Sequence, residues 1–188
     1  MVAVVALASL AVLAFYNIKA SFGNVFEMPN ESSRIVEDFS PPVKWQGEKV
    51  TKKVAFENTG NVKLVLRFQY AESFTKADGT LLPNTSAGLD VVDKVWTSPN
   101  GTVSPAELQT SWTKGADGWY YYKFVMKPAD KVFVMDSIKA KTSPFSAEYQ
   151  NANYKLSFVY ETMMIDTANI TKLWNKTPTI TGNTVTWN

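Results

Sequence analysis

The feature that most constrains this chain is a two-residue alternation of apolar and polar side chains that recurs along its length. It is clearest in residues 62–70 and 153–162. One parity of these segments holds the apolar residues Val62, Leu64, Leu66, Phe68 and Tyr70, and Tyr154, Leu156, Phe158 and Tyr160. Residues two apart lie on the same side of a β-strand, so this period predicts strands with one buried face.

The remaining strand candidates are shorter and lie between turn-forming residues rich in Asn, Gly, Asp and Pro. They are Arg34–Val36, Val50–Glu57, Trp119–Met126, Lys131–Ile138 and Asn183–Trp187, with Leu89–Trp96 as either a strand or a short helix. Residues 71–88 are predicted to form a loop, and residues 163–188 follow a less regular pattern. Seven or more short strands and hardly any helical period predict an all-β antiparallel sandwich, one domain over residues 29–188.

An apolar segment, residues 1–14, precedes this domain. Its uncharged run is too short for a transmembrane helix, which needs about 20 residues, and it matches the core of a secretory signal peptide. Val12 and Ala14 are small enough for signal-peptidase cleavage before Phe15, although a basic region ahead of the run is missing. The alternative is a retained apolar N-terminus that packs inside a fibre. With cleavage, the mature form has no membrane segment.

The next segment, residues 15–28, alternates like a strand but has no hairpin partner close in sequence, because Pro29 and the pair Pro41-Pro42 isolate it. Its apolar parity holds Tyr16, Ile18, Ala20 and Phe22. A lone strand with an apolar face needs a sheet edge to bind. In its own subunit it becomes an ordinary first strand, and in a neighbouring subunit it joins the two copies by strand addition.

Composition excludes several function classes. The 188-residue chain is 45% hydrophobic, and its formal charge of +2 is spread without a basic stripe, so nucleic acid is not an expected partner. It contains no Cys and no His, which removes disulfides, thiolate metal sites and every nucleophile pair that uses His. Catalysis by carboxylate pairs, Ser-Lys or Tyr remains open, and a carboxylate-dependent glycosidase is a third alternative, but the sequence gives no positive sign of either. We expect a protein that is not an enzyme and that has neither a cofactor nor a metal site.

Two further patterns concern surface chemistry. Sequons for N-glycosylation begin at Asn30, Asn84, Asn100, Asn169 and Asn175, and they matter only on an exported protein whose host adds glycans. The aromatic run Tyr120–Tyr122, with Trp112 and Trp119, is either a strand with aromatic residues on both faces or an exposed sugar-binding surface. We favour the strand. The second reading corresponds to a monomeric secreted surface binding or adhesion module.

Several segments in order resemble the TasA/camelysin group of exported biofilm-matrix proteins, including its BsaA-like branch. These are residues 14–19 (AFYNIK), 48–60 (EKVTKKVAFENTG), 117–122 (DGWYYY), 125–128 (VMKP) and 154–160 (YKLSFVY), together with Trp112. The segments span most of the chain, but each alone is weak. Residues 45–48 (WQGE) and 127–130 (KPAD) depart from the turns usual in that group, so the chain resembles a distant member.

The resemblance implies a jelly-roll sandwich that is cleaved by a SipW-type signal peptidase and secreted. It also implies that the N-terminal segment of each subunit completes the sheet of its neighbour, giving a head-to-tail homopolymer in a pilus or biofilm matrix fibre. On this basis residues 15–28 are the expected donor strand, with Tyr16, Ile18, Ala20 and Phe22 at the subunit interface. The resemblance favours the fibre over an ordinary first strand.

Overall fold

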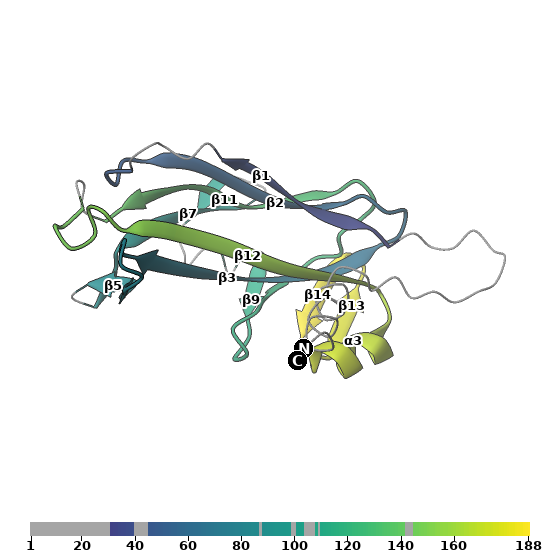
Figure 1. The fold of residues 1–188 in the computed structure, drawn as a ribbon. Helices are drawn as coiled ribbons and strands as arrows, with labels where there is room; N and C mark the ends of the chain where they lie inside the picture. The colour runs from purple at the N-terminus through teal and green to yellow at the C-terminus, as the bar shows by residue number, and fades with distance from the viewer. Residues whose placement is uncertain are drawn as a thin grey trace, which may run out of the picture.

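The computed structural model describes residues 31–39, 45–86, 88–98, 101–103, 108, 110–141 and 145–188. These residues form two antiparallel sheets that pack face to face (Figure 1). The predictions for residues 1–28 lie outside the described part of the chain. The all-β antiparallel prediction is confirmed.

Sheet A contains five strands in the order β1 (Ser33–Phe39), β2 (Val50–Asn58), β11 (Lys131–Ala140), β7 (Val92–Ser98) and β8 (Gly101–Val103). Sheet B follows the order β12 (Asn153–Met164), β3 (Leu64–Thr75), β10 (Tyr120–Tyr122) and β9 (Trp112–Lys114). A short strand, β4 (Leu81–Leu82), pairs with the end of β3. The hairpin of β5 (Thr85–Ser86) and β6 (Leu89–Asp90) stands apart from both sheets.

The main core lies between the two sheets and is rich in aromatic side chains. Phe68 of β3 is its centre: its ring lies 4.6 Å from Trp112 in an edge-to-face arrangement and 5.6 Å from Phe56 of sheet A. Aromatic pairs at such distances stabilise a core beyond the area they bury. The apolar parity predicted for residues 64–68 faces this core. The prediction of a single buried face is wrong for β3, because Val65 and Arg67 on its opposite face are buried as well.

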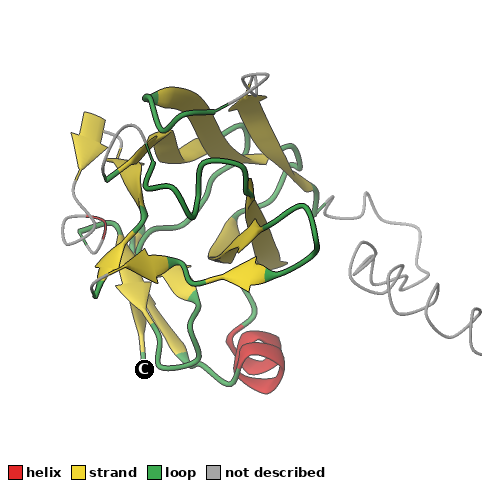
Figure 2. Ribbon diagram, turned by 60° about the vertical axis from the view of Figure 1, so that its left-hand side comes forward, coloured by secondary structure: helices red, strands yellow, loops and turns green. Residues whose placement is uncertain are grey.

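A second, smaller core covers the outer face of sheet B. Helix α3 (Thr167–Trp174) and the hairpin of β13 (Pro178–Thr181) and β14 (Thr184–Trp187) pack there (Figure 2). We call residues 165–188 the C-terminal cap. Its last strand was predicted, but α3 was not. Asp166 caps the N-terminus of α3 and Asn175 ends it in a left-handed conformation, both typical helix-boundary residues.

Two strand boundaries also differ from the sequence prediction. Residues 71–88 are not a plain loop, because β3 continues to Thr75 and carries the buried Phe74 into contact with Tyr149 and Tyr154. The predicted strand 119–126 is regular only over Tyr120–Tyr122. Beyond it, Phe124 makes one isolated bridge to Thr184 of β14, and Met126 makes one to Leu64 at the start of β3.

Candidate functional site

One flank of the sandwich ends in two edge strands, β1 of sheet A and β12 of sheet B. Among the described strands, β1 pairs only with β2, and the twelve-residue β12 pairs only with β3. The outer edge of each therefore presents backbone groups with no strand partner in the described chain. A long unpaired edge is a template for another strand unless charges, proline or a covering element block it.

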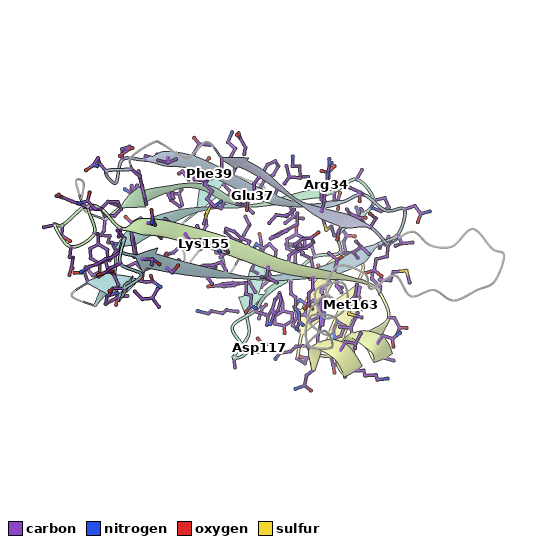
Figure 3. The ribbon with its side chains drawn as sticks, viewed as in Figure 1. Arg34, Glu37, Phe39, Asp117, Lys155 and Met163 are labelled. Carbon is purple, nitrogen blue, oxygen red and sulfur yellow. The ribbon has the colours of Figure 1, made fainter. Side chains whose placement is uncertain are left out.

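The inner faces of these two strands are only partly covered. On β12 the half-buried side chains touch the main core but keep part of their surface accessible; they are Tyr154, Leu156, Phe158 and Tyr160. On β1, Ile35 is half-buried and Phe39 is exposed. We call the margin formed by these residues of β1 and β12 the open flank. Figure 3 labels Glu37 and Phe39 on β1 and Lys155 on β12 along this margin.

A buried lysine lies beneath the β1 side of the open flank. Lys52 is only 4% exposed, although it occupies the apolar parity of β2. Its ammonium lies 3.1 Å from a carboxylate oxygen of Glu37 and 4.5 Å from the centre of the Phe39 ring. A buried ammonium requires such partners because its desolvation is otherwise unfavourable. The pair therefore ties the inner face of β1 to β2.

The two ends of the open flank differ. At one end the hydroxyl groups of Ser33 and Thr162 share a hydrogen bond of 2.8 Å, which joins β1 to β12. Burial raises the pKa of the nearby Glu31 carboxyl, opposed by a backbone hydrogen bond at Met164. At the other end Trp45 packs 4.9 Å from Phe145 and 5.4 Å from Tyr154. Glu31 and the first residue of β1 thus lie beside the last residues of β12.

A polar cluster joins the sheets near the Trp45 end. Lys94 of sheet A donates to Glu72 of sheet B at 2.8 Å, and the Tyr154 hydroxyl donates to the second oxygen of Glu72, also at 2.8 Å. Burial, followed by the charge of Glu72, raises the pKa of Tyr154. The arrangement holds the phenol neutral and the carboxylate fully paired, which favours a structural role over acid–base chemistry.

The edge of β3 is notched between β4 and β10. A shallow cavity of about 400 Å³ lies there, lined by Tyr70, Ala71, Glu72, Asn84, Lys114, Gly118 and Tyr120. Burial raises the pKa of Tyr70, and the neighbouring Tyr120 adds to the effect. Nothing in the described part of the chain gathers three or more metal-ligating side chains. No described helix is long and apolar enough to cross a membrane.

The aromatic run is divided between the two cores. Tyr120 and Tyr122 face the main core with Trp112, whereas Tyr121 faces the cap. The favoured reading of a strand with aromatic residues on both faces is confirmed. Beside Tyr121, the Arg67 guanidinium lies 4.2 Å from the Trp119 ring and 4.6 Å from the Trp174 ring, and it donates twice to Glu161 at 2.9 and 2.7 Å.

The predicted site residues fall in different places. The donor-strand residues Tyr16, Ile18, Ala20 and Phe22, and the sequon residues Asn30 and Asn100, lie outside the described residues. The Asn84 side chain is engaged, since its amide nitrogen donates to the Glu72 carbonyl at 2.8 Å. Asn169 and Asn175 are exposed at the start and end of α3, and the Asn169 amide donates to Asp166.

Sequence reasoning missed the open flank as a site. The alternation of residues 153–162 showed that β12 has an apolar face, but periodicity does not say whether a strand lies inside a sheet or at its edge. A scan against models of protein families finds no match for this chain. A comparison with curated proteins also finds none.

Proposed function

We propose that this protein is a secreted structural subunit that polymerises into an extracellular filament, such as a pilus or biofilm matrix fibre. Residues 15–28 of one copy add as a strand to the open flank of the next. The proposal also takes the sandwich to be a jelly roll with one strand supplied by a neighbour. Its partners are other copies of the chain and, during export, a signal peptidase.

The observation that carries the proposal is the half-exposed apolar face of β12 along an edge without a strand partner in the described chain. The same side chains in the middle of a sheet are fully buried, as Leu66 and Phe68 of β3 are. An added strand would cover Leu156, Phe158 and Tyr160 and pair the free backbone groups of β12. Residues 16–22 of this segment have the matching pattern, one apolar and one polar parity.

The expected energy is sufficient for assembly. Burying Tyr16, Ile18 and Phe22 at about 1.5 to 3 kcal/mol each gives roughly 5 to 9 kcal/mol as an upper estimate, before backbone hydrogen bonds and the entropy of association. The contact is head-to-tail, so it repeats without closing. The competing monomeric sugar-binding module has less support, because Trp112, Tyr121 and Tyr122 lie in the two cores.

Electron microscopy of the purified mature protein tests this function. We expect long filaments from the full mature chain and soluble, less stable monomers after deletion of residues 15–26. A variant with Tyr16, Ile18 and Phe22 replaced by Ser keeps the length of the segment and should also remain monomeric. The matched control replaces only the opposite parity, Asn17 and Ser21, by Ala, and it should still form filaments.

A complementation experiment gives a second readout. A synthetic peptide of residues 15–28 should bind the truncated protein and raise its melting temperature, because a ligand of the folded state stabilises it. The peptide with Ser at its three large apolar positions should not. Filaments that persist unchanged after deletion of residues 15–26 would contradict the proposed function.

A further inference from the structure

We infer that the donor segment runs antiparallel to β12 of the acceptor copy, and that the opposite direction produces only closed assemblies. The inference rests on the proposed function and goes further by giving the direction of the donor strand along β12 and the residues that pair. It follows from the directions of β1 and β12 and from the position of Glu31 beside Met164.

The edge strands of the open flank run in opposite directions (Figure 1). Ser33, which begins β1, touches Thr162 near the end of β12. A strand placed between the two edges is therefore antiparallel to one and parallel to the other. Antiparallel pairing is slightly the more stable of the two. The direction of the donor thus selects its main partner. A donor that runs from the Met164 end to the Asn153 end pairs antiparallel with β12. A donor that runs the opposite way pairs antiparallel with β1.

The first direction gives an open filament. The donor segment then ends near Asn153 of the acceptor copy. Glu31 of the donor copy follows this segment by only a few residues, so it must also lie near Asn153 of the acceptor. In each copy Glu31 lies at the opposite end, beside Met164. The Glu31 end of one copy therefore meets the Asn153 end of the next, and the contact repeats. The shift between copies is about 40 to 50 Å, since twelve strand residues rise about 3.3 Å each.

The reverse direction closes. A segment antiparallel to β1 ends beside Ser33, at the end of the molecule where Glu31 of its own subunit also lies. There it forms a hairpin with β1 of the same copy, or two copies exchange segments across a twofold axis. In both arrangements the segment is paired with a strand and no free donor is left, so neither arrangement propagates. Only addition along β12 accounts for a filament.

Face and charge together select the pairing. The apolar parity of the donor must face inward with Leu156, Phe158 and Tyr160, so even-numbered residues oppose even-numbered residues. On the outer parity Lys19 would meet Lys155, Ser157, Val159 or Glu161. Both bonds from Arg67 go to the same oxygen of Glu161, so the other oxygen can accept a second cation. Lys19 opposite Glu161 places Ser21 opposite Val159 and Phe22 opposite Phe158. It also places Asn24 opposite Leu156, where the apolar pairing is interrupted.

The ends of the molecule fit this contact. Leu81 and Leu89 are 70% and 59% exposed. Leu81 pairs with Thr75, which itself pairs with Asn153, so this leucine lies at the end that would meet the next copy. At the opposite end Ile165 directly follows β12 and is also exposed. End-to-end stacking in the filament direction covers apolar side chains at both ends of the molecule.

The chain contains no Cys, so disulfide trapping tests the inference cleanly. We pair Ser21→Cys with Val159→Cys, because Val159 lies on the exposed outer side of β12. After mild oxidation we expect a ladder of covalent multimers on a non-reducing gel. Ser21→Cys with Val36→Cys, on the outer side of β1, is the matched control and should give at least tenfold less product. A ladder from the Val36 pair instead of the Val159 pair overturns the inference.

Two outcomes separate this inference from the proposed function. Filaments that form normally but give no ladder from the Val159 pair reject β12 as the acceptor and leave the filament function standing. The absence of filaments from the native chain rejects the function itself. A peptide of residues 15–28 carrying Ser21→Cys, oxidised with the truncated Val159→Cys protein, repeats the test without polymerisation. Trapping through Ser157→Cys in place of Val159→Cys would overturn the pairing of Lys19 with Glu161.

Discussion

The outer face of sheet B and its margin at β12 are two apolar surfaces that the chain treats differently. The outer face is closed by the C-terminal cap, whose residues Ile170, Trp174 and Val185 are buried against Val65 and Tyr121. The margin at β12 keeps its aromatic side chains half-exposed within the described chain. The cap follows directly after β12, so it reaches the outer face at little entropic cost. The surface left half-exposed is the one that the proposed donor strand would cover.

The two surfaces also differ in specificity. Under the cap, Arg67 lies against two tryptophan rings and forms a double hydrogen bond with Glu161, so its geometry is fixed from several sides. The open flank offers mainly an alternating apolar face and backbone groups that have no strand partner in the described chain. We therefore expect substitutions under the cap to act on folding and substitutions at the flank to act on assembly.

Trp174→Ala should have the largest effect on folding. It empties a buried site between Tyr121, Trp187 and Arg67, so the free energy of unfolding should fall by about 3 to 5 kcal/mol. Urea denaturation of the chain without residues 15–28 measures this free energy, because the truncated chain is expected not to assemble. Leu173→Ala, next to it but exposed, is the matched control and should change stability by less than about 1 kcal/mol. If the two substitutions lower the free energy of unfolding equally, the buried contacts of the cap contribute no more to stability than its exposed side chains.

Tyr154→Phe tests how a buried phenol near the open flank makes the stability of the fold depend on pH. The phenol donates to Glu72 at 2.8 Å, so its loss should lower the free energy of unfolding by about 1.5 to 3 kcal/mol near neutral pH. Because burial raises the pKa of Tyr154, the folded state keeps the proton that the unfolded chain loses above pH about 10. Stability therefore falls as pH rises through that range, and less steeply in Tyr154→Phe.

The same titration can be compared under the cap. Burial raises the pKa of Tyr121 to about 12, so Tyr121→Phe should also reduce the loss of stability above pH about 10. Urea midpoints measured between pH 8 and 11 give both slopes. If neither variant differs from the parent chain in that range, the buried phenols do not control alkaline unfolding.

Phe158→Ala should separate folding from assembly most clearly. The side chain is half-buried, so we expect a loss of about 1 to 2 kcal/mol in the truncated chain, less than for a core phenylalanine. The critical concentration for filaments should rise about tenfold if about 1.4 kcal/mol of the donor contact is lost. Phe133→Ala is the control: Phe133 is 43% exposed on sheet A, and its loss should leave assembly unchanged.

Much of this fold follows from side-chain periodicity. The alternation in residues 62–70 and 153–162 identified the two longest strands and the parity that faces the main core. It did not predict that the opposite face of β3 is also buried, at Val65 and Arg67. Lys52 departs from the pattern, and only the structure shows why it is tolerated: Glu37 and Phe39, distant in sequence, surround its ammonium. A contact of that kind leaves no mark on the local sequence.

The helix and the site were harder to predict for physical reasons. Helix α3 has only eight residues, so its apolar period is short, and its signals were the capping residues Asp166 and Asn175. The candidate site depends on which strands lie at the edges of the sheets, and the order of strands is set by long-range packing. The sequence pattern suggested the proposed donor segment, whereas the proposed acceptor strand depends on the directions of β1 and β12.

Ser33→Ala tests the smallest expected effect, the hydrogen bond that holds the two edges together at one end. The Ser33 and Thr162 hydroxyls lie 2.8 Å apart, and one such bond contributes about 0.5 to 1.5 kcal/mol. A double-mutant cycle with Thr162→Ala should give a coupling energy of about 0.5 kcal/mol or more. Filaments should persist, because the apolar face of β12 remains intact. Strictly additive effects of the two substitutions would show that packing alone, and not this hydrogen bond, holds β1 and β12 together at that end.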